Sequence, residues 1–319
     1  MSKNIFLTGG AGFIGSHTTQ ALAARGDQVT IIDAFDFGYD VVHKEHNAML
    51  LKEYSNVQIV RGDIRDSALI NRLFKETRPD VVVHLAARAG VRPSLEDPVS
   101  YSDINITGTI RLLEAIQKHS IPQLVFASSS SIYGSRKQGP FRESDIVDVP
   151  ASAYAATKKS GELFCANWNY LYGLHATCLR FFTVYGPRQR PEMAISLFTD
   201  RIRKGIPITM FGDGSSLRDY TFVQDIAQGV MQAIDNPIGY EVLNLGNGSP
   251  IRLDTLIQSI AEVVGKEAII QKLPDQPGDV PMTFADITKA QEMIGYAPKT
   301  TIKEGIAQFY EWLSQYDPI

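Results

Sequence analysis

The stretch that most constrains the fold lies within the first fifteen residues. Residues 4–8 read as a short apolar strand, and Gly9-Gly10-Ala11-Gly12-Phe13-Ile14-Gly15 separates it from a helical pattern that extends to Arg25. Glycines at such a junction permit a tight turn, bring backbone close to a pyrophosphate and let the helix pack on the strand. The helix N-terminus offers free N–H groups and a positive dipole to phosphates. The pattern predicts a dinucleotide site formed by Gly9, Gly12, Phe13, Ile14 and Gly15.

Further apolar runs repeat this alternation of strand and helix. Residues 28–32, 57–60, 81–85 and 124–127 read as strands, with helical segments around 67–76 and 101–118 between them, and a helix and strand follow at 153–172 and 175–182. Strands that are apolar on both faces and alternate with helices are typical of a parallel sheet covered on each side. We therefore expect an α/β fold with a Rossmann-like doubly wound parallel sheet.

The pattern changes after Pro187. Turn-forming residues crowd positions 212–215, 244–248 and 275–279, with short helices between them. This change predicts a smaller C-terminal α/β lobe for the substrate. We expect residues 1–187 to form the dinucleotide-binding domain, with the catalytic residues, and residues 188–319 to form mainly the substrate lobe, with segments exchanged between the two.

Charge and cysteine content exclude several classes of protein. The net charge of −4 argues against a general nucleic-acid binder, which carries a basic surface. Cys165 and Cys178 are expected to be reduced, packed thiols. Met1 leads directly into a strand, with no signal-peptide pattern, and no run approaches about 18 apolar residues. We expect a cytoplasmic protein without a membrane segment. His43 and His46 have no further ligands nearby, so no metal site is predicted.

Two acidic positions follow predicted strands. Asp33 ends the second strand, 24 positions after Gly9, where an acid binds the ribose hydroxyls of NAD and repels the 2'-phosphate of NADP. Asp63, followed by Ile64, lies after the third strand and is a candidate for the adenine amine, although a turn cap is an alternative. NAD is the expected cofactor.

A tyrosine and a lysine stand four positions apart in the predicted helix 153–172. Tyr154 and Lys158 share one helix face. An ammonium near a phenol favours the phenolate, so Lys158 is expected to lower the pKa of Tyr154 and make it a base for a sugar hydroxyl. Upstream, Ser129, Ser130 and Ser131 belong to a run of four serines after a strand, where hydroxyls point into the ligand crevice. Turn capping is the alternative for most of the four.

The glycine turn, the serine cluster and the Tyr-x-x-x-Lys pair together resemble the extended short-chain dehydrogenase/reductase family, in particular its nucleotide-sugar epimerases and dehydratases. The resemblance extends from Phe6 to about Trp312. It implies that the serine 25 positions before Tyr154, which is Ser129, is catalytic with Tyr154 and Lys158. It further implies that the NAD site includes Leu85, Ala86, Ala87, Asn105 and Lys158.

Within the family, three runs, 185–194, 87–94 and 276–281, are similar to those of UDP-glucuronate 4-epimerases. Where galactose-type epimerases have Arg-Tyr-Phe-Asn, this chain departs from them with Arg180-Phe181-Phe182-Thr183. Thr183 and Arg190 would offer a hydroxyl and a planar guanidinium to a C5 carboxylate; a surface ion pair is the alternative for Arg190. Related decarboxylases have a Glu where this chain has Ser131, which favours epimerisation over loss of CO2.

The expected reaction is therefore 4-epimerisation of UDP-glucuronate to UDP-galacturonate through a transient 4-keto sugar and bound NAD. The alternatives are a UDP-glucose or UDP-N-acetylglucosamine 4-epimerase, a UDP-glucuronate decarboxylase, and an NAD sensor without activity. The resemblance implies a homodimer. It also implies that UDP binds to the C-terminal lobe, through Phe211, Arg218 and Asp279. Arg92 of the first domain is a further candidate near the phosphates, and the alternative is that it has no ligand role.

Overall fold

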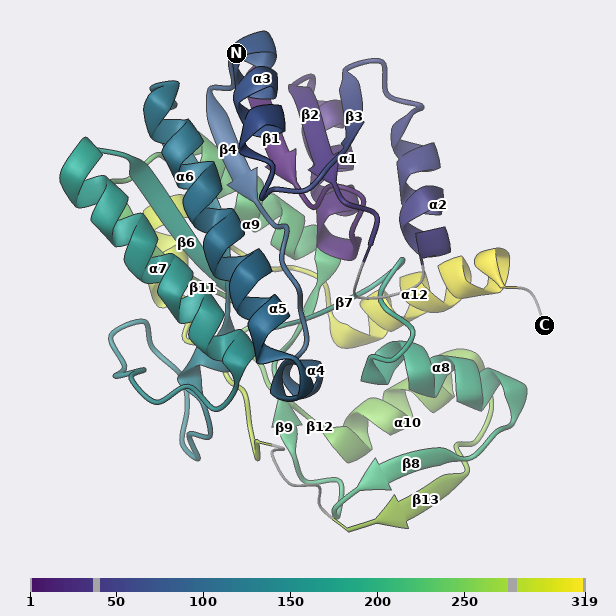
Figure 1. Ribbon diagram of the computed structural model, residues 1–319. Coiled ribbons are helices and arrows are strands. Elements are labelled where there is room, and N and C mark those ends of the chain that lie inside the picture. Colours follow the sequence, from purple (N-terminus) through teal and green to yellow (C-terminus); the bar gives the residue numbers. More distant parts are fainter. Residues whose placement is uncertain (1, 37–40, 275–279, 318–319) are drawn as a thin grey trace.

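The computed structural model of the chain describes residues 2–36, 41–274 and 280–317. Its centre is a seven-stranded sheet with the strand order β11-β6-β5-β4-β1-β2-β3, in which every neighbouring pair is parallel (Figure 1). The strands are β1 (Asn4–Thr8), β2 (Gln28–Asp33), β3 (Val57–Arg61), β4 (Val81–His84), β5 (Gln123–Ser129), β6 (His175–Phe181) and β11 (Tyr240–Leu245). The predicted doubly wound sheet is confirmed.

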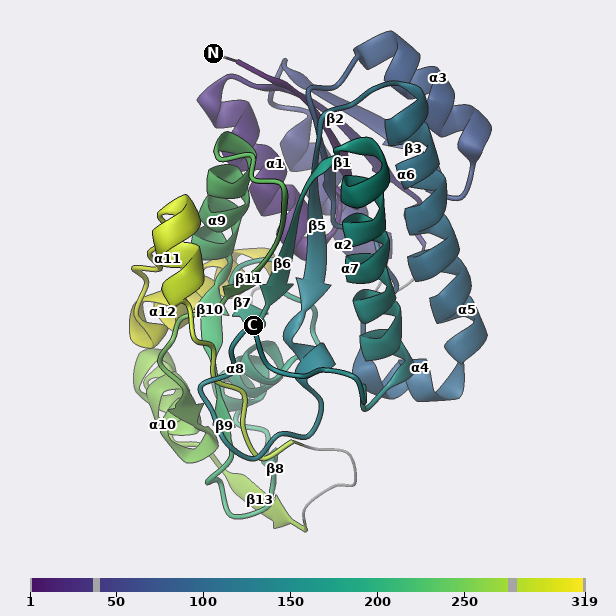
Figure 2. The same cartoon turned by 90° about the vertical axis from the view of Figure 1, so that its left-hand side faces the viewer.

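Helices cover both faces of this sheet, which explains why its strands are apolar on both sides (Figure 2). In β1, Ile5 and Leu7 pack into one buried cluster and Phe6 into the other. The first cluster lies beneath α1 (Phe13–Arg25), α9 (Val223–Asp235) and α11 (Thr288–Ile294). The second lies beneath α3 (Ser67–Thr77), α6 (Gly108–Lys118) and α7 (Ala153–Tyr172), and it includes Cys165 and Cys178, which are free buried thiols as predicted.

The helix predicted at 101–118 is interrupted. It consists of α5 (Pro98–Ser102), a π-helical turn η1 (Asp103–Thr107) and α6. A π turn widens the helix and changes which side chains face inward. Asn105, in the middle of that turn, is only 4% exposed, and its amide lies among backbone groups rather than in solvent.

The C-terminal lobe has a hydrophobic core of its own, so the predicted smaller lobe is confirmed. Buried side chains such as Phe198, Ile257 and Phe309 join its three main helices. Its helices are α8 (Ala194–Lys204), α10 (Leu253–Val264) and α12 (Ile302–Tyr316). Its strands form three pairs: β8 (Ile208–Phe211) with β13 (Ile270–Leu273), β7 (Thr183–Tyr185) with β10 (Tyr220–Phe222), and β9 (Leu217–Arg218) with β12 (Ile251–Arg252). The edge strand β11 and the covering helix α9 of the main sheet both follow residue 187 in the chain, so the sheet contains segments from before and after this position. The domain boundary at residue 187 stays a prediction.

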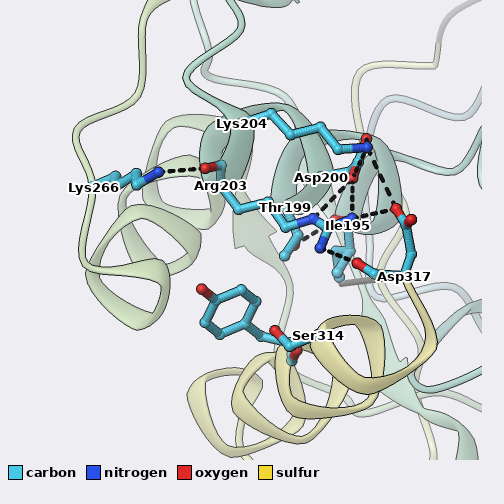
Figure 3. Close-up of polar contacts among 9 residues, drawn as sticks. Ile195, Thr199, Asp200, Arg203, Lys204, Lys266, Ser314 and Asp317 are labelled. Atoms are coloured by element: carbon cyan, nitrogen blue, oxygen red, sulfur yellow. Dashed lines mark hydrogen bonds and ion pairs between the residues drawn. The ribbon is translucent and has the colours of Figure 1, made fainter. Parts of the chain in front are cut away.

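A cluster of charged side chains fixes the end of α12 to α8 (Figure 3). The side chain of Arg203 is 1% exposed, and its Nε and Nη2 donate to Asp200 Oδ1 at 2.9 and 2.8 Å. Arg203 also binds the backbone carbonyl and the carboxylate of Asp317. Lys204 adds ion pairs of 2.9 Å to Asp200 and 3.4 Å to Asp317. We call Asp200, Arg203, Lys204 and Asp317 the Arg203 clamp.

The helix α2 (Val41–Leu51) was not predicted from the sequence, and it packs against the C-terminal lobe. The rings of His43 and His46 contact Tyr316 of α12, with centroids 5.6 and 5.0 Å apart. Among the described residues, no three His, Cys, Asp or Glu side chains are grouped so that they could hold a metal ion. In that same part of the chain, none of the helices combines the length and apolar character needed to cross a membrane.

Candidate active site

A cavity of about 800 Å³ lies at the carboxyl ends of the central strands. It opens where the strand order reverses, because β1 sits between β2 and β4, which are far apart in the chain. Ligands of open α/β sheets bind at this reversal. Twenty of the site residues predicted from the sequence line the cavity: Gly9, Gly12, Phe13, Ile14, Gly15, Asp33, Asp63, Ile64, Leu85, Ala86, Ala87, Arg92, Ser129, Ser130, Ser131, Tyr154, Lys158, Thr183, Arg190 and Arg218.

The glycine turn has the geometry that a phosphate cradle needs. Gly9 has a φ of +74°, and a Cβ there would lie 2.8 Å from the backbone nitrogen of Ala86. A Cβ on Gly15 would lie 2.0 Å from the carbonyl oxygen of Gly9. Gly12 caps α1 without a side chain, so the first N–H groups of the helix face the cavity. The turn therefore fits a pyrophosphate at the end of α1.

Asp33 is the last residue of β2, lines the cavity and is buried. Its carboxylate accepts hydrogen bonds from the backbone N–H groups of Ala11 and Phe35, at 3.1 and 2.9 Å. Lys44 of α2, which sequence reasoning missed, forms a 2.9 Å ion pair with Asp33 and also lines the cavity. Only the tertiary packing of α2 brings Lys44 there, so no local pattern signals it.

Asp63 lines the cavity and also takes part in a local turn. Its Oδ1 accepts the backbone N–H of Arg65 at 2.8 Å, and the Arg65 guanidinium binds both carboxylate oxygens. The side-chain hydrogen bond from Arg65 lowers the pKa of Asp63. The sequence left open whether Asp63 contacts adenine or caps a turn. Because Asp63 both caps a turn and lines the cavity, the two roles are compatible.

Asn105 is not among the described residues that line the cavity; instead it supports the loop that does. Its Oδ1 accepts the Arg88 N–H at 2.7 Å, and its Nδ2 donates to the Arg88 carbonyl and to the Thr157 hydroxyl, both at 3.0 Å. Asn105 thus fixes the segment after β4 to α7, next to Lys158. The expected cofactor contact gives way to this supporting role because the π turn points the amide inward.

A buried histidine continues this support beneath the glycine turn. The Thr109 hydroxyl donates to the Asn105 carbonyl at 2.6 Å, so His84 Nε2 must donate to Thr109 at 3.0 Å. His84 Nδ1 then accepts from the hydroxyl of Thr8, at 2.7 Å. Burial, with a smaller effect of the Lys158 charge, lowers the pKa of His84 to about 3. His84 is therefore neutral at ordinary pH.

The four serines after β5 have different roles. Ser128 is buried and donates to Glu162 at 2.6 Å. Ser129 Oγ accepts from both the N–H and the hydroxyl of Ser131, at 3.2 and 2.9 Å, which fills its two lone pairs. The Ser129 proton is then left to point toward the Tyr154 phenol, whose pKa Ser129 lowers. The structure thus places Ser129, the serine implied by the family resemblance, against Tyr154.

Tyr154 and Lys158 share the inner face of α7, but their electrostatics differ from expectation. Burial raises the pKa of Tyr154, and it outweighs the lowering by the Ser129 hydrogen bond and by the charge of Arg190. Lys158 Nζ donates to the Ala127 carbonyl at 2.7 Å and lies 6.0 Å from the Tyr154 ring centroid. Burial lowers the pKa of Lys158 to about 8. The predicted lowering of the Tyr154 pKa by Lys158 is not seen, because Lys158 points to β5 instead.

The loop 186–190 carries Arg190 into the cavity and is anchored to α1. Arg188 Nη2 donates to His17 Nδ1 at 2.8 Å and to Gln20 at 2.5 Å, so His17 Nε2 donates to the Pro187 carbonyl at 2.8 Å. Arg190 forms a 3.3 Å ion pair with Glu192, whose side chain is 57% exposed. Arg190 thus forms the surface ion pair that was the alternative to a substrate role, and it also lines the cavity.

The residues predicted to bind UDP are only partly brought together. Arg218 and Arg92 line the cavity, as do Thr283 and Met193, which the sequence did not single out for the site. Thr283 accepts the Asp219 N–H at 3.2 Å, next to Arg218. Phe211 ends β8 and is not among the described residues around the cavity. Asp279 lies outside the described residues.

A doubly wound fold with a Ser129–Tyr154–Lys158 centre at its strand reversal defines a dinucleotide-dependent class of enzyme site. Comparison with known proteins makes this specific. The GDP-mannose 4,6 dehydratase family profile matches residues 6–309. The chain belongs to this family, one of the extended short-chain dehydrogenases/reductases, as predicted from the sequence.

Several relatives are sugar-nucleotide epimerases. The chain is 41% identical to a UDP-glucuronate 4-epimerase of Thermodesulfobacterium geofontis, over 96% of this chain and 94% of the relative. It is 35% identical, with a TM-score of 0.91, to a UDP-glucuronic acid 4-epimerase from Bacillus cereus in complex with UDP-glucuronic acid and NAD, covering 98% and 99% of the two chains. It is 31% identical, with a TM-score of 0.91 and 99% coverage of both chains, to a UDP-N-acetylglucosamine 4-epimerase from Methanobrevibacter ruminantium in complex with UDP-N-acetylmuramic acid.

Proposed function

We propose that this protein is an NAD-dependent enzyme that inverts C4 of UDP-glucuronate to give UDP-galacturonate. The coarser prediction, an NAD-dependent UDP-sugar 4-epimerase, is confirmed by the family and by the relatives crystallised with NAD. One observation carries the choice of a uronate. Arg190 and Thr183 line the same cavity as Ser129 and Tyr154, and the charge of Arg190 is near enough to lower the pKa of Tyr154.

The residues present fit NAD. The Gly9–Gly15 turn leaves no room for side chains where the backbone approaches, the α1 N-terminus faces the cavity, and Asp33 lies where a ribose is expected. The carboxylate of Asp33 disfavours the extra phosphate of NADP. Bound NAD would supply the acceptor of the C4 hydride and return the hydride to the other face of the sugar.

The chain's own residues supply the proton transfers. Tyr154 takes the proton of the C4 hydroxyl and later returns it, while the Ser129 hydroxyl stabilises the oxygen that gains charge. Arg190 and Thr183 bind the C5 carboxylate, and Arg218 and Arg92 bind the diphosphate. The 4-keto intermediate is a β-keto acid, so a carboxylate held out of alignment with the carbonyl π system resists loss of CO2.

A product assay tests this proposal. The purified protein is incubated with NAD and, separately, with UDP-glucuronate, UDP-glucose and UDP-N-acetylglucosamine, and the products are separated by chromatography. We expect UDP-galacturonate as the main product and much slower conversion of the two neutral sugars. A pentose product with CO2 would indicate a decarboxylase, and no turnover of any sugar would indicate an NAD sensor.

A second candidate is epimerisation of UDP-N-acetylglucosamine. The Methanobrevibacter ruminantium epimerase named above is as similar in fold as the Bacillus cereus uronate enzyme, at a TM-score of 0.91 for each. Faster conversion of UDP-N-acetylglucosamine than of UDP-glucuronate in the same assay would favour this candidate. The Arg190 substitution described in the Discussion separates the two by a second route.

We also propose that the protein forms a homodimer through α7. Leu163 and Tyr170, seven positions apart on one face of this helix, are 59% and 86% exposed, and Leu171 beside them is 54% exposed. Large apolar side chains grouped on an outward face are typical of an interaction site. Sedimentation analysis should give twice the chain mass, and Leu163→Glu should reduce it to the chain mass. A wild-type monomer at micromolar concentration would contradict the dimer.

A further inference from the structure

Directly behind the serine cluster lies an ion pair that the reaction scheme above does not use. Arg180 of β6 binds Glu162 of α7 through two parallel hydrogen bonds, from Nε at 2.8 Å and from Nη2 at 2.9 Å. Their side chains are 2% and 0% exposed. Ser128, the residue before Ser129, donates to the same carboxylate at 2.6 Å. One buried carboxylate thus joins β5, β6 and α7.

The ion pair continues into the turn that carries the serines. Arg180 Nη1 donates to the Tyr133 hydroxyl at 2.9 Å, and Tyr133 is the last residue of η2 (Ser130–Tyr133). The Tyr133 hydroxyl donates to Asn244 Oδ1 of β11 at 2.6 Å. We call Ser128, Tyr133, Glu162, Arg180 and Asn244 the Glu162 network. Its hydrogen bonds flank Ser129 on both sides along the chain.

The network is also in register with the catalytic face of α7. Tyr154, Lys158 and Glu162 follow one another at four-residue spacing, so all three project from the same face of the helix. Glu162 therefore links the helix that carries Tyr154 and Lys158 to the strand that carries Ser129. Lys158 makes a second link across this junction through its 2.7 Å hydrogen bond to the Ala127 carbonyl, and Ser129 lies near enough to Tyr154 to lower its pKa.

Stability alone does not account for such an arrangement. Removing two charges from water costs more than a buried ion pair commonly returns, and apolar side chains of similar size often do as well or better. A bidentate arginine–carboxylate pair does, however, fix direction as well as distance. The network thus fixes the positions of β5, β6 and α7 relative to one another, next to the residues that take part in the reaction.

We propose that Glu162, Arg180 and Tyr133 are positioning residues that hold the Ser129 hydroxyl against Tyr154 for the proton transfers. The proposal rests on the epimerase function proposed above. None of the three side chains is among the described residues lining the cavity, so their effect is transmitted through Ser128, Ser129 and α7. Loss of the network should lower kcat while leaving KM and the affinity for NAD nearly unchanged.

The decisive variant replaces the ion pair with an apolar pair, Glu162→Leu with Arg180→Met, which fills the space and leaves no fully buried charge unpaired. Lys159, which also pairs with Glu162 at 3.5 Å, is 26% exposed and can be solvated. We expect a melting temperature close to that of the wild type, kcat lower by about 10- to 100-fold, and KM within about threefold. NAD binding, measured by calorimetry, should change by less than about threefold. The milder variants Ser128→Ala and Tyr133→Phe each delete one hydroxyl and should lower kcat by about 3- to 10-fold.

Asp200→Asn in the Arg203 clamp is the matched control, since it weakens another arginine–carboxylate pair whose residues are not among the described residues lining the cavity. It should lower the melting temperature and leave kcat unchanged. A wild-type kcat in the apolar double variant and in the two mild variants would overturn the proposal. If the double variant does not fold, a wild-type kcat in the two mild variants is enough to overturn it. The kcat of each variant is compared with that of the wild type on whichever UDP-sugar the wild type converts. If that sugar is not UDP-glucuronate, the proposed function is contradicted, but the effect of the Glu162 network on kcat can still be measured.

Discussion

Arg180 and Arg203 are both almost completely buried, yet they lie in contrasting surroundings. The carboxylate of Glu162 beside Arg180 is 0% exposed, whereas Asp200 and Asp317 beside Arg203 are 33% and 53% exposed. Water thus reaches one side of the Arg203 clamp and not the Glu162 network. Arg180 connects the elements that carry the catalytic groups, and Arg203 fixes the end of the chain to α8 (Figure 3).

The contrast indicates that the two halves of the molecule use charge for different purposes. In the roles proposed above, charged groups along the carboxyl edge of the sheet define the geometry of a reaction. In the C-terminal lobe, those of the Arg203 clamp join helices, and Arg190 is proposed to select the substrate. Substitutions in the first region should change chemistry more than folding stability. Substitutions in the second should change specificity or stability and leave the chemistry intact.

The largest effect is expected for Tyr154→Phe. Losing the proton-transfer group should lower kcat by about 10²- to 10⁴-fold with every UDP-sugar that the wild type converts. The ring packs as before, so NAD affinity and melting temperature should stay close to wild-type values. Steady-state kinetics with calorimetry measures both. Activity within tenfold of the wild type would mean that another group takes the proton.

A smaller and more selective effect is expected for Arg190→Ala. If the guanidinium binds the uronate carboxylate, kcat/KM for UDP-glucuronate should fall by about 10- to 150-fold, equivalent to about 1.5–3 kcal/mol. With UDP-glucose the change should be less than about threefold. Equal losses of kcat/KM for both sugars would show that Arg190 contributes to the reaction itself and does not select the uronate.

A third test concerns the neutral His84 beneath the glycine turn. Its pKa is lowered to about 3 in the folded protein, against about 6.5 when unfolded. The unfolded chain therefore takes up a proton between pH 6.5 and pH 3 that the native state refuses, and stability is lost as the pH falls through this range. In urea unfolding between pH 4 and 6, His84→Gln should reduce the slope of stability against pH by about 1.4 kcal/mol per pH unit. An unchanged slope would show that His84 is charged in the native state.

The smallest effect is expected for Asp317→Ala in the Arg203 clamp. Asp317 is half exposed and Asp200 remains to bind Arg203, so the free energy of unfolding should fall by roughly 0.5–1 kcal/mol. The value of kcat at 25 °C should not change. Denaturant unfolding and kinetics on the same preparation check both. A lower kcat would show that the C-terminal lobe also contributes to catalytic geometry, and the contrast with Arg180 would weaken.

The sequence was most informative where residues that act together are close in the chain. Gly9, Gly12 and Gly15 serve one turn, and Tyr154 and Lys158 are one helical turn apart, so spacing alone predicted their meeting. The alternation of apolar strands and helices likewise predicted the sheet. Among the four serines, the family resemblance implied Ser129, and the hydrogen bonds separate it from Ser128, which is bound to Glu162.

Residues that meet only through tertiary packing were not predictable in this way. Lys44 reaches Asp33 because α2 folds back over the cofactor end of the cavity. Arg180 was read only as part of a family motif, and its partner Glu162 was not considered. Asn105 was assigned to the cofactor, but a π turn, which periodicity does not signal, directs it to the Arg88 backbone instead.

The most direct test of the proposed reaction follows the hydrogen on C4 of the sugar. UDP-glucuronate that carries deuterium at C4 is incubated with the enzyme and NAD, and the products are analysed by mass spectrometry and NMR. If the hydride leaves and returns within one cavity while Arg190 retains the carboxylate, UDP-galacturonate should form with its deuterium still on C4. Formation of a pentose with release of CO2, exchange of the deuterium with solvent, or no reaction of the uronate would contradict the account.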